Sequence, residues 1–127
     1  MLAVDTNVLV RLITRDDAAQ VHAAEDFVAK GAWISHLILA ETMWVLDSVY
    51  DLSREQISTA VEMLLNHQEL TLQDADVVRA ALNQFNDHAK VEFSDCLALE
   101  IARKAGHIPL ATFDRDFAKL EDVEHLV

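Results

Sequence analysis

Four acidic side chains occur at positions where a carboxylate could bind a cation. They come from four separate segments of the 127-residue chain: Asp5, Glu41, Asp95 and Asp114. Asp5 follows a short apolar stretch that predicts a buried strand at 2–4, and Asp114 follows one that predicts a strand at 108–112. Ligand sets made only of oxygen favour a hard cation such as Mg²⁺ or Mn²⁺, which retains several waters and bridges to phosphate oxygens. The acids therefore predict a divalent-cation site, provided that the fold brings them together.

Each acid also has a structural interpretation. Asp5 precedes a helical pattern, and aspartate is a preferred N-cap residue. Ser94 or Asp95 could likewise cap the helix that they open. Glu41 is the only charge between residues 37 and 46. Because its helical neighbours are all apolar, we expect it to be at least partly buried. A salt-bridged or snorkelling glutamate is the structural alternative to a site residue here.

Short apolar segments alternate with helical patterns along the chain. We expect strands at 2–4, 32–35, 70–73, 108–112 and 123–127. We expect helices at 8–13, 16–31, 36–50, 53–67, 74–88 and 94–106, and a turn with a short helix at 113–120. Gly31 and Gly106 are expected as helix C-caps, and Ser53 with Gln56 as a capping box. This order predicts an α/β fold, with helices on both faces of a mainly parallel sheet of four to five short strands. Right-handed crossovers would carry all four acids to the carboxyl edge of that sheet.

Composition narrows the class of protein. The length suits a single domain over residues 1–127, and the two glycines and one proline leave no linker. Ten basic and 22 acidic residues give a formal charge of −12, which argues against a non-specific grip on nucleic acid. The lone Cys96 and the absence of a long apolar run predict a soluble cytoplasmic protein. Six scattered histidines offer no zinc pattern, and no glycine-rich loop is available for phosphate.

The segments around the acids resemble those of one family. "VDTNVLVR", "LAETMWVL", "FSDCLALEIA" and "LATFDRDF" together are similar to the PIN-domain family, specifically to VapC-like toxin ribonucleases. The resemblance covers the whole chain and implies a three-layer α/β/α PIN-like fold. It implies that Asp5, Glu41, Asp95 and Asp114 are catalytic, metal-binding carboxylates. It further assigns supporting positions to Thr6, Asn7, Thr112 and Asp116.

The resemblance also implies an activity and partners. It implies a Mg²⁺- or Mn²⁺-dependent endoribonuclease that hydrolyses RNA phosphodiester bonds, inhibited by a small cognate antitoxin, and a homodimer. For the homodimer we expect the apolar helix at 37–50, or its neighbour at 53–66, to contribute. Arg11, Arg15 and Arg115 lie close in sequence to the acids and are candidates for contacting RNA, although solvated surface charge is an equally good interpretation.

Two other functions stay open. A non-catalytic PIN-like scaffold would use the acids to bind a cation or a basic partner peptide. A haloacid-type phosphatase is a weaker alternative, because such enzymes carry a second aspartate two residues after the first, where this chain has Asn7.

Overall fold

Residues 1–127 are all described by the computed structural model of the chain, which divides into two compact units. The units are Met1–Ala75 and Asp76–Val127. The first unit contains, in order, β1 (Leu2–Ala3), α1 (Thr6–Thr14), α2 (Ala18–Val28), β2 (Ala32–Ile34), α3 (His36–Ser48), α4 (Arg54–Asn66) and β3 (Leu70–Leu72).

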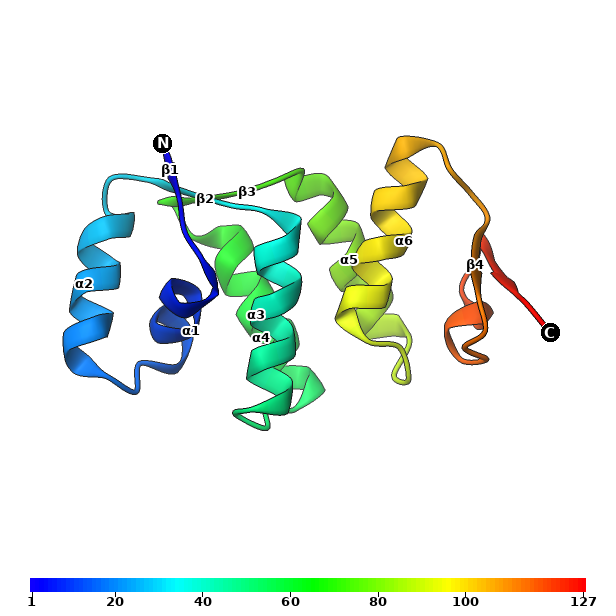
Figure 1. Cartoon of the computed structure of the whole chain (residues 1–127), viewed down its shortest axis with the longest axis horizontal. Helices are drawn as coiled ribbons and strands as arrows, with labels where there is room; N and C mark the ends of the chain where they lie inside the picture. Colours follow the sequence, from blue (N-terminus) through cyan, green and yellow to red (C-terminus); the bar gives the residue numbers. More distant parts are fainter. The chain divides into compact units, whose positions relative to one another are not determined.

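The three strands of the first unit form one parallel sheet in the order β1-β2-β3. Leu2 pairs with Ala32, and Ala32 pairs in turn with Leu70. Both crossovers advance in the same direction along the sheet, and right-handed crossovers of this kind place their helices on one face. Figure 1 shows α1 to α4 lying on one side of these strands. The N-terminal ends of α1 and α3 therefore follow directly from the carboxyl ends of β1 and β2.

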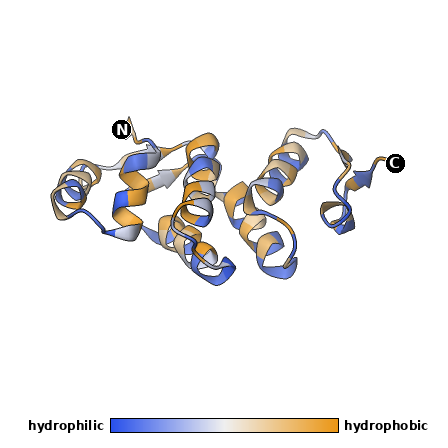
Figure 2. Cartoon of the chain, turned by 60° about the horizontal axis from the view of Figure 1, so that its bottom comes forward, coloured by the Kyte–Doolittle hydropathy of each residue, from blue (hydrophilic) through white to orange (hydrophobic).

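The core of the first unit comes from the inward faces of these helices. Leu9, Leu39, Leu46, Val61 and Leu64 are fully buried. Burying a side chain of this size stabilises the fold by roughly 1.5–3 kcal/mol. Figure 2 shows hydrophobic and hydrophilic residues on different sides of the same helices, which is the pattern of elements that cover a core with one face.

The expectation that residues 2–4 form a buried strand is wrong for its first two residues. Leu2 is 66% exposed and Ala3 is also exposed, whereas Val4 is buried. The strand is two residues long and lies at the end of its three-stranded sheet, so that it has a hydrogen-bonded neighbour in that sheet on one side only.

The second unit begins with two helices and ends with a pair of strands. Its elements are α5 (Ala75–Asp87), α6 (Phe93–Ala105), β4 (Leu110–Thr112), the 3₁₀ helix η1 (Phe117–Lys119) and β5 (Val123–His125). β4 and β5 are parallel. The rings of Phe85 and Phe93 meet edge to face, with centroids 5.9 Å apart and planes at 82°. Val78, Leu82 and Leu99 are also buried in this unit.

A partly buried charge network joins α6 to the strand pair. Glu100 is only 7% exposed, and its Oε1 accepts a hydrogen bond of 3.2 Å from Arg103 Nε. The other end of the Arg103 guanidinium forms an ion pair with Asp122, directly before β5. Gln84 from α5 donates to the second Glu100 oxygen at 3.4 Å. Because a buried carboxylate is costly without partners, this network is a structural requirement of the second unit.

Five short strands, all in parallel pairs, confirm the predicted α/β class, and they are paired as three and two. The capping box of Ser53 and Gln56 and the C-cap at Gly106 (φ +82°) are confirmed. The C-cap expected at Gly31 is wrong by two residues, because α2 ends at Val28 and Ala29 takes the cap position. No helix is sufficiently long and apolar to cross a bilayer. The single domain expected over residues 1–127 stays a prediction.

Candidate active site

Asp5 lies between the end of β1 and the first residue of α1. Its Oδ1 accepts hydrogen bonds from the backbone N–H groups of Asn7 (3.1 Å) and Val8 (3.4 Å). The N-cap interpretation of Asp5 is therefore confirmed. The second carboxylate oxygen makes none of these bonds, and the side chain is exposed, so capping α1 leaves one oxygen available for a ligand. The N-terminal end of α1 also favours a negative charge at this position.

Glu41 is exposed, and the expectation that it is partly buried is wrong. The reason is that two of its apolar neighbours on α3 are themselves uncovered. Leu37 is 74% exposed and Trp44 is 65% exposed. Their apolar character therefore does not mark a buried face, because a helical spacing alone does not say which side of a helix packs against the core.

Thr6 connects the first two acids. Its side chain is buried, with 6% of the residue exposed, and its Oγ1 donates a hydrogen bond of 2.6 Å to Glu41 Oε1. Thr6 follows Asp5 directly, so this bond brings a carboxylate of α3 to the start of α1. The first unit thus links one predicted acid, Glu41, to the residue that follows another, Asp5. Asn7, a predicted supporting residue, is exposed and contacts Asp5 through its backbone.

Asp95 and Asp114 form a second pair, in the second unit. Asp95 lies in the first turn of α6 and is half-buried. Burial raises the pKa of its carboxyl group above the ordinary aspartate value, and the negative charges of Asp114 and then Glu92 raise this pKa further. The two acids therefore share one region of negative potential. The proposal that Ser94 or Asp95 caps α6 is wrong, because the helix already begins at Phe93.

Asp114 is fixed by a tight turn after β4. Its backbone N–H donates to Thr112 Oγ1 at 3.0 Å. Its Oδ1 accepts from the backbone N–H groups of Asp116 (2.8 Å) and Phe117 (3.0 Å). As at Asp5, the second oxygen takes no part in these bonds. Asp116 forms an exposed ion pair with Lys119 at 3.4 Å.

The donor set suits a hard cation. The four acids offer carboxylate oxygens only, and at Asp5, Glu41 and Asp114 one oxygen is held by a donor while the other is not. The pKa of Asp95 is raised by burial and, after that, by neighbouring negative charge, and a cation would relieve the second of these effects. Within either unit, however, no three acidic, histidine or cysteine side chains come close enough to hold one ion. Each unit supplies a pair.

The three arginines predicted near the acids differ in their surroundings. Arg11 donates to Asp16 Oδ1 (3.1 Å) and to Tyr50 Oη (3.0 Å), and the Tyr50 hydroxyl donates to Asp16 Oδ2 (3.0 Å). This network ties α1 to the turn that follows α3, and it was not predictable from local patterns because Tyr50 lies 39 residues from Arg11. Arg15 forms an ion pair with Glu25 at 3.4 Å. Arg115 is exposed and makes no hydrogen bond or ion pair.

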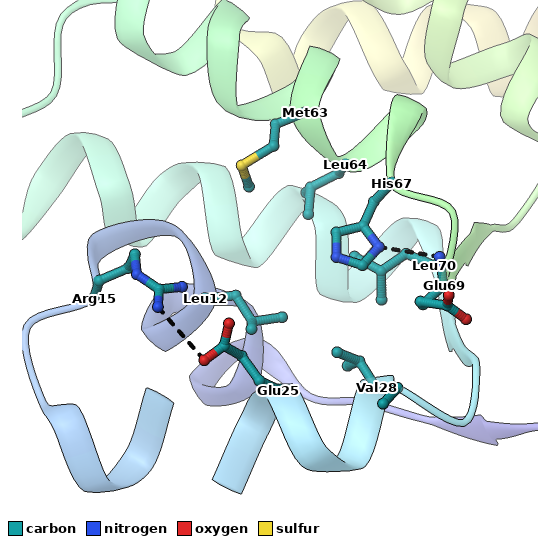
Figure 3. A pocket seen from close by; sticks show the side chains of 10 residues that line it. Leu12, Arg15, Glu25, Val28, Met63, Leu64, His67, Glu69 and Leu70 are labelled. Carbon is teal, nitrogen blue, oxygen red and sulfur yellow. Dashed lines mark hydrogen bonds and ion pairs between the residues drawn. The ribbon is translucent and has the colours of Figure 1, made fainter. Parts of the chain in front are cut away.

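A pocket of about 270 Å³ lies elsewhere in the first unit, among α1, α2, α4 and β3. Figure 3 shows the Arg15–Glu25 ion pair on one side of it and His67 on another, around the apolar side chains of Leu12 and Leu70. His67 Nδ1 accepts a hydrogen bond of 3.1 Å from the backbone N–H of Glu69. None of the four predicted acids lines this pocket, so it is distinct from the candidate metal-binding residues.

Comparisons with known proteins identify the family. Residues 2–123 match the PIN domain family. A protein named VapC ribonuclease, from Aquifex aeolicus strain VF5, is 27% identical, over 94% of this chain and 92% of its own length. The crystal structure of the Mycobacterium tuberculosis toxin VapC20, which cleaves the sarcin–ricin loop, covers 98% of both chains with 22% identity and a TM-score of 0.44. Since the family match spans nearly every element from β1 to β5, the chain belongs to the PIN domain family, whose three-layer α/β/α class is the one predicted from the sequence.

Proposed function

We propose that this chain is a Mg²⁺- or Mn²⁺-dependent endoribonuclease, the toxin of a toxin–antitoxin pair that acts in the cytoplasm, and that residues 1–127 form one PIN domain. The observation that carries the proposal is the Thr6–Glu41 hydrogen bond, which brings Glu41 to the helix that Asp5 caps, in a chain of the PIN family. The similarity to a protein named VapC ribonuclease over nearly the whole chain supports the activity.

Asp5, Glu41, Asp95 and Asp114 are the residues that would hold the metal. When bound at such acids, a divalent ion lowers the pKa of a water molecule and stabilises the charge that develops around the attacked phosphorus. The chain's own contribution is to fix the carboxylates before substrate arrives. The α1 N–H groups hold Asp5, Thr6 holds Glu41, and the turn after Thr112 holds Asp114. Groups fixed in this way cost little reorganisation during the reaction.

Cleavage of labelled RNA tests the proposal. The purified protein should cut single-stranded RNA with Mg²⁺ or Mn²⁺ and not with EDTA. The substitutions Asp5→Asn, Glu41→Gln and Asp114→Asn should abolish cleavage while keeping side-chain shape. Asp47→Asn is the matched control, because Asp47 is an exposed acid on the same helix as Glu41. Cleavage in EDTA would contradict metal dependence, and RNA or peptide binding without cleavage under any metal would favour the non-catalytic scaffold.

The proposed antitoxin should act through the same acids. A cluster of carboxylates attracts a guanidinium or an ammonium group, and arginine matches a carboxylate in bidentate geometry. We therefore propose that the antitoxin inhibits by placing an arginine or lysine among these acids. Replacing that cation by alanine should leave a bound but poorly inhibiting antitoxin. Full inhibition by the alanine variant would refute this mode of inhibition.

We also propose a symmetric homodimer with α3 at the interface. Leu37 and Trp44 lie on α3 and leave two large apolar side chains exposed. Exposed apolar groups on one helix are typical of an interface. Light scattering at micromolar concentration should give the mass of a dimer, and Leu37→Lys should shift it to the monomer. A monomeric parent protein would contradict this arrangement.

A further inference from the structure

The loop after β4 presents three different side chains in succession. Phe113 is 77% exposed, Asp114 is the candidate metal ligand, and Arg115 is an exposed cation without a partner. Phe117, four residues after Phe113, is buried in the second unit. The two phenylalanines of "TFDRDF" therefore have opposite surroundings: one anchors the turn, and the other stands in solvent beside a candidate acid.

The backbone that carries the exposed ring is fixed on both sides. The Phe113 carbonyl accepts a hydrogen bond from His125 Nε2 at 3.2 Å. The Thr112 carbonyl accepts from the backbone N–H of Leu126 at 2.8 Å, and Asp114 N–H donates to Thr112 Oγ1. A planar group held on an ordered backbone loses little conformational entropy when it binds a partner. Phe113 is therefore a preformed aromatic surface and not the end of a loose loop.

The net negative charge of the chain indicates what kind of contact the Phe113 ring is suited to make. With a formal charge of −12, the chain has few cations to offer to phosphates. At least five of its ten basic side chains are committed to ion pairs: Arg11, Arg15, Arg103, Lys104 and Lys119. Stacking of a base on an aromatic ring does not depend on charge, and single-stranded RNA is commonly recognised in this way. An acidic ribonuclease needs such a contact more than a basic one does.

We propose that Phe113 is a base-stacking residue for single-stranded RNA, which holds a nucleotide next to the phosphate that Asp114 serves, while Arg115 meets a neighbouring phosphate. This inference rests on the proposed ribonuclease function. In it, the three successive residues contact three parts of the substrate: a base, the reacting centre and the backbone. The contact with the base contributes to substrate binding and not to the chemical step.

Steady-state cleavage of a short fluorogenic oligoribonucleotide tests the proposal. Phe113→Leu keeps an apolar side chain of similar size and removes the aromatic face. It should raise KM by about tenfold, within the range for one stacked base, with little change in kcat. Phe113→Trp should keep the parent KM. An abasic nucleotide, moved through the substrate one position at a time, should raise the parent KM at one position by a similar factor. Phe113→Leu should then add nothing at that position.

Phe27→Leu is the matched control, because Phe27 is an exposed phenylalanine on α2 that adjoins none of the four acids. Melting curves should show that both leucine variants are folded. If the parent cleaves RNA and Phe113→Leu keeps its KM, the stacking proposal is wrong and the proposed function stands. If Phe113→Leu changes the oligomeric mass and raises KM equally on intact and abasic RNA, the ring serves a protein contact instead. A parent that neither binds nor cleaves RNA overturns both proposals.

Discussion

Replacing Thr6 by valine removes one hydrogen-bond donor and keeps the shape of the side chain. Thr6 is buried, and its hydroxyl lies 2.6 Å from Glu41 Oε1. Hydrogen bonds to charged groups contribute roughly 1.5–3 kcal/mol to stability. Glu41 is exposed and regains water when its donor is lost, and the added valine methyl is buried, so we expect a net loss of only about 1 kcal/mol. For a chain of this length, that loss lowers Tm by about 4 °C.

A double-mutant cycle measures this bond. The cycle compares the free energies of unfolding in urea, without metal, of the parent, Thr6→Val, Glu41→Ala and the double variant. The coupling energy between the two sites should be about 1 kcal/mol. Thr6→Ser keeps the hydroxyl and loses a buried methyl group. It should destabilise the protein without losing its coupling to Glu41. If Thr6→Val costs as much in the Glu41→Ala background as in the parent, the bond contributes nothing and the reasoning is refuted.

Three further predictions follow from the same geometry. Asp5→Ala should destabilise the metal-free protein by about 1 kcal/mol in urea, while Asp5→Asn should cost almost nothing, because asparagine is an equally good N-cap; equal losses would contradict the cap. Asp95→Asn should raise Tm at pH 7, because the folded protein disfavours the charged form of the Asp95 carboxyl group. This gain in Tm should shrink as pH falls through the raised pKa of Asp95 toward the ordinary aspartate value, and a gain that grows on acidification would contradict the prediction. Arg115→Ala should lower the slope of log K for RNA binding against log salt by about 1, whereas Arg11→Ala should leave the slope unchanged and lower Tm, since Arg11 is held by Asp16 and Tyr50.

Much of the secondary structure was predictable from residues that lie a few positions apart. Periodicity identified the strands and helices, and the side-chain types at Ser53, Gln56 and Gly106 identified caps that the structure contains. The cap at Asp5 was predictable because it depends on the junction of strand and helix, and the role of Asp5 as a metal ligand stays a proposal. These are contacts between residues a few positions apart, so the sequence carries them directly.

Contacts between distant segments were not predictable in this way. The exposure of Glu41 depends on which face of α3 meets the core, and an apolar stripe that includes the exposed Trp44 indicates the wrong face. The partners of Arg11 include Tyr50, which lies just after the end of α3. At α6, Ser94 and Asp95 are both good cap residues, but the buried Phe93 belongs to the helix, which therefore starts before either of them.

The network around Arg103 has a consequence for local opening of the protein. If β5 separated from β4, Asp122 would move with it, and the buried Glu100 would lose part of the guanidinium that compensates its charge. Fraying of this short strand therefore costs electrostatic free energy, because it weakens the compensation of the buried Glu100 charge on α6. Amide protons of β4, β5 and the last turns of α6 should then exchange with solvent as one cooperative group, at a single opening free energy. The amide protons of the loop that carries Asp114 should then be protected from exchange as well, although little of the loop itself is buried.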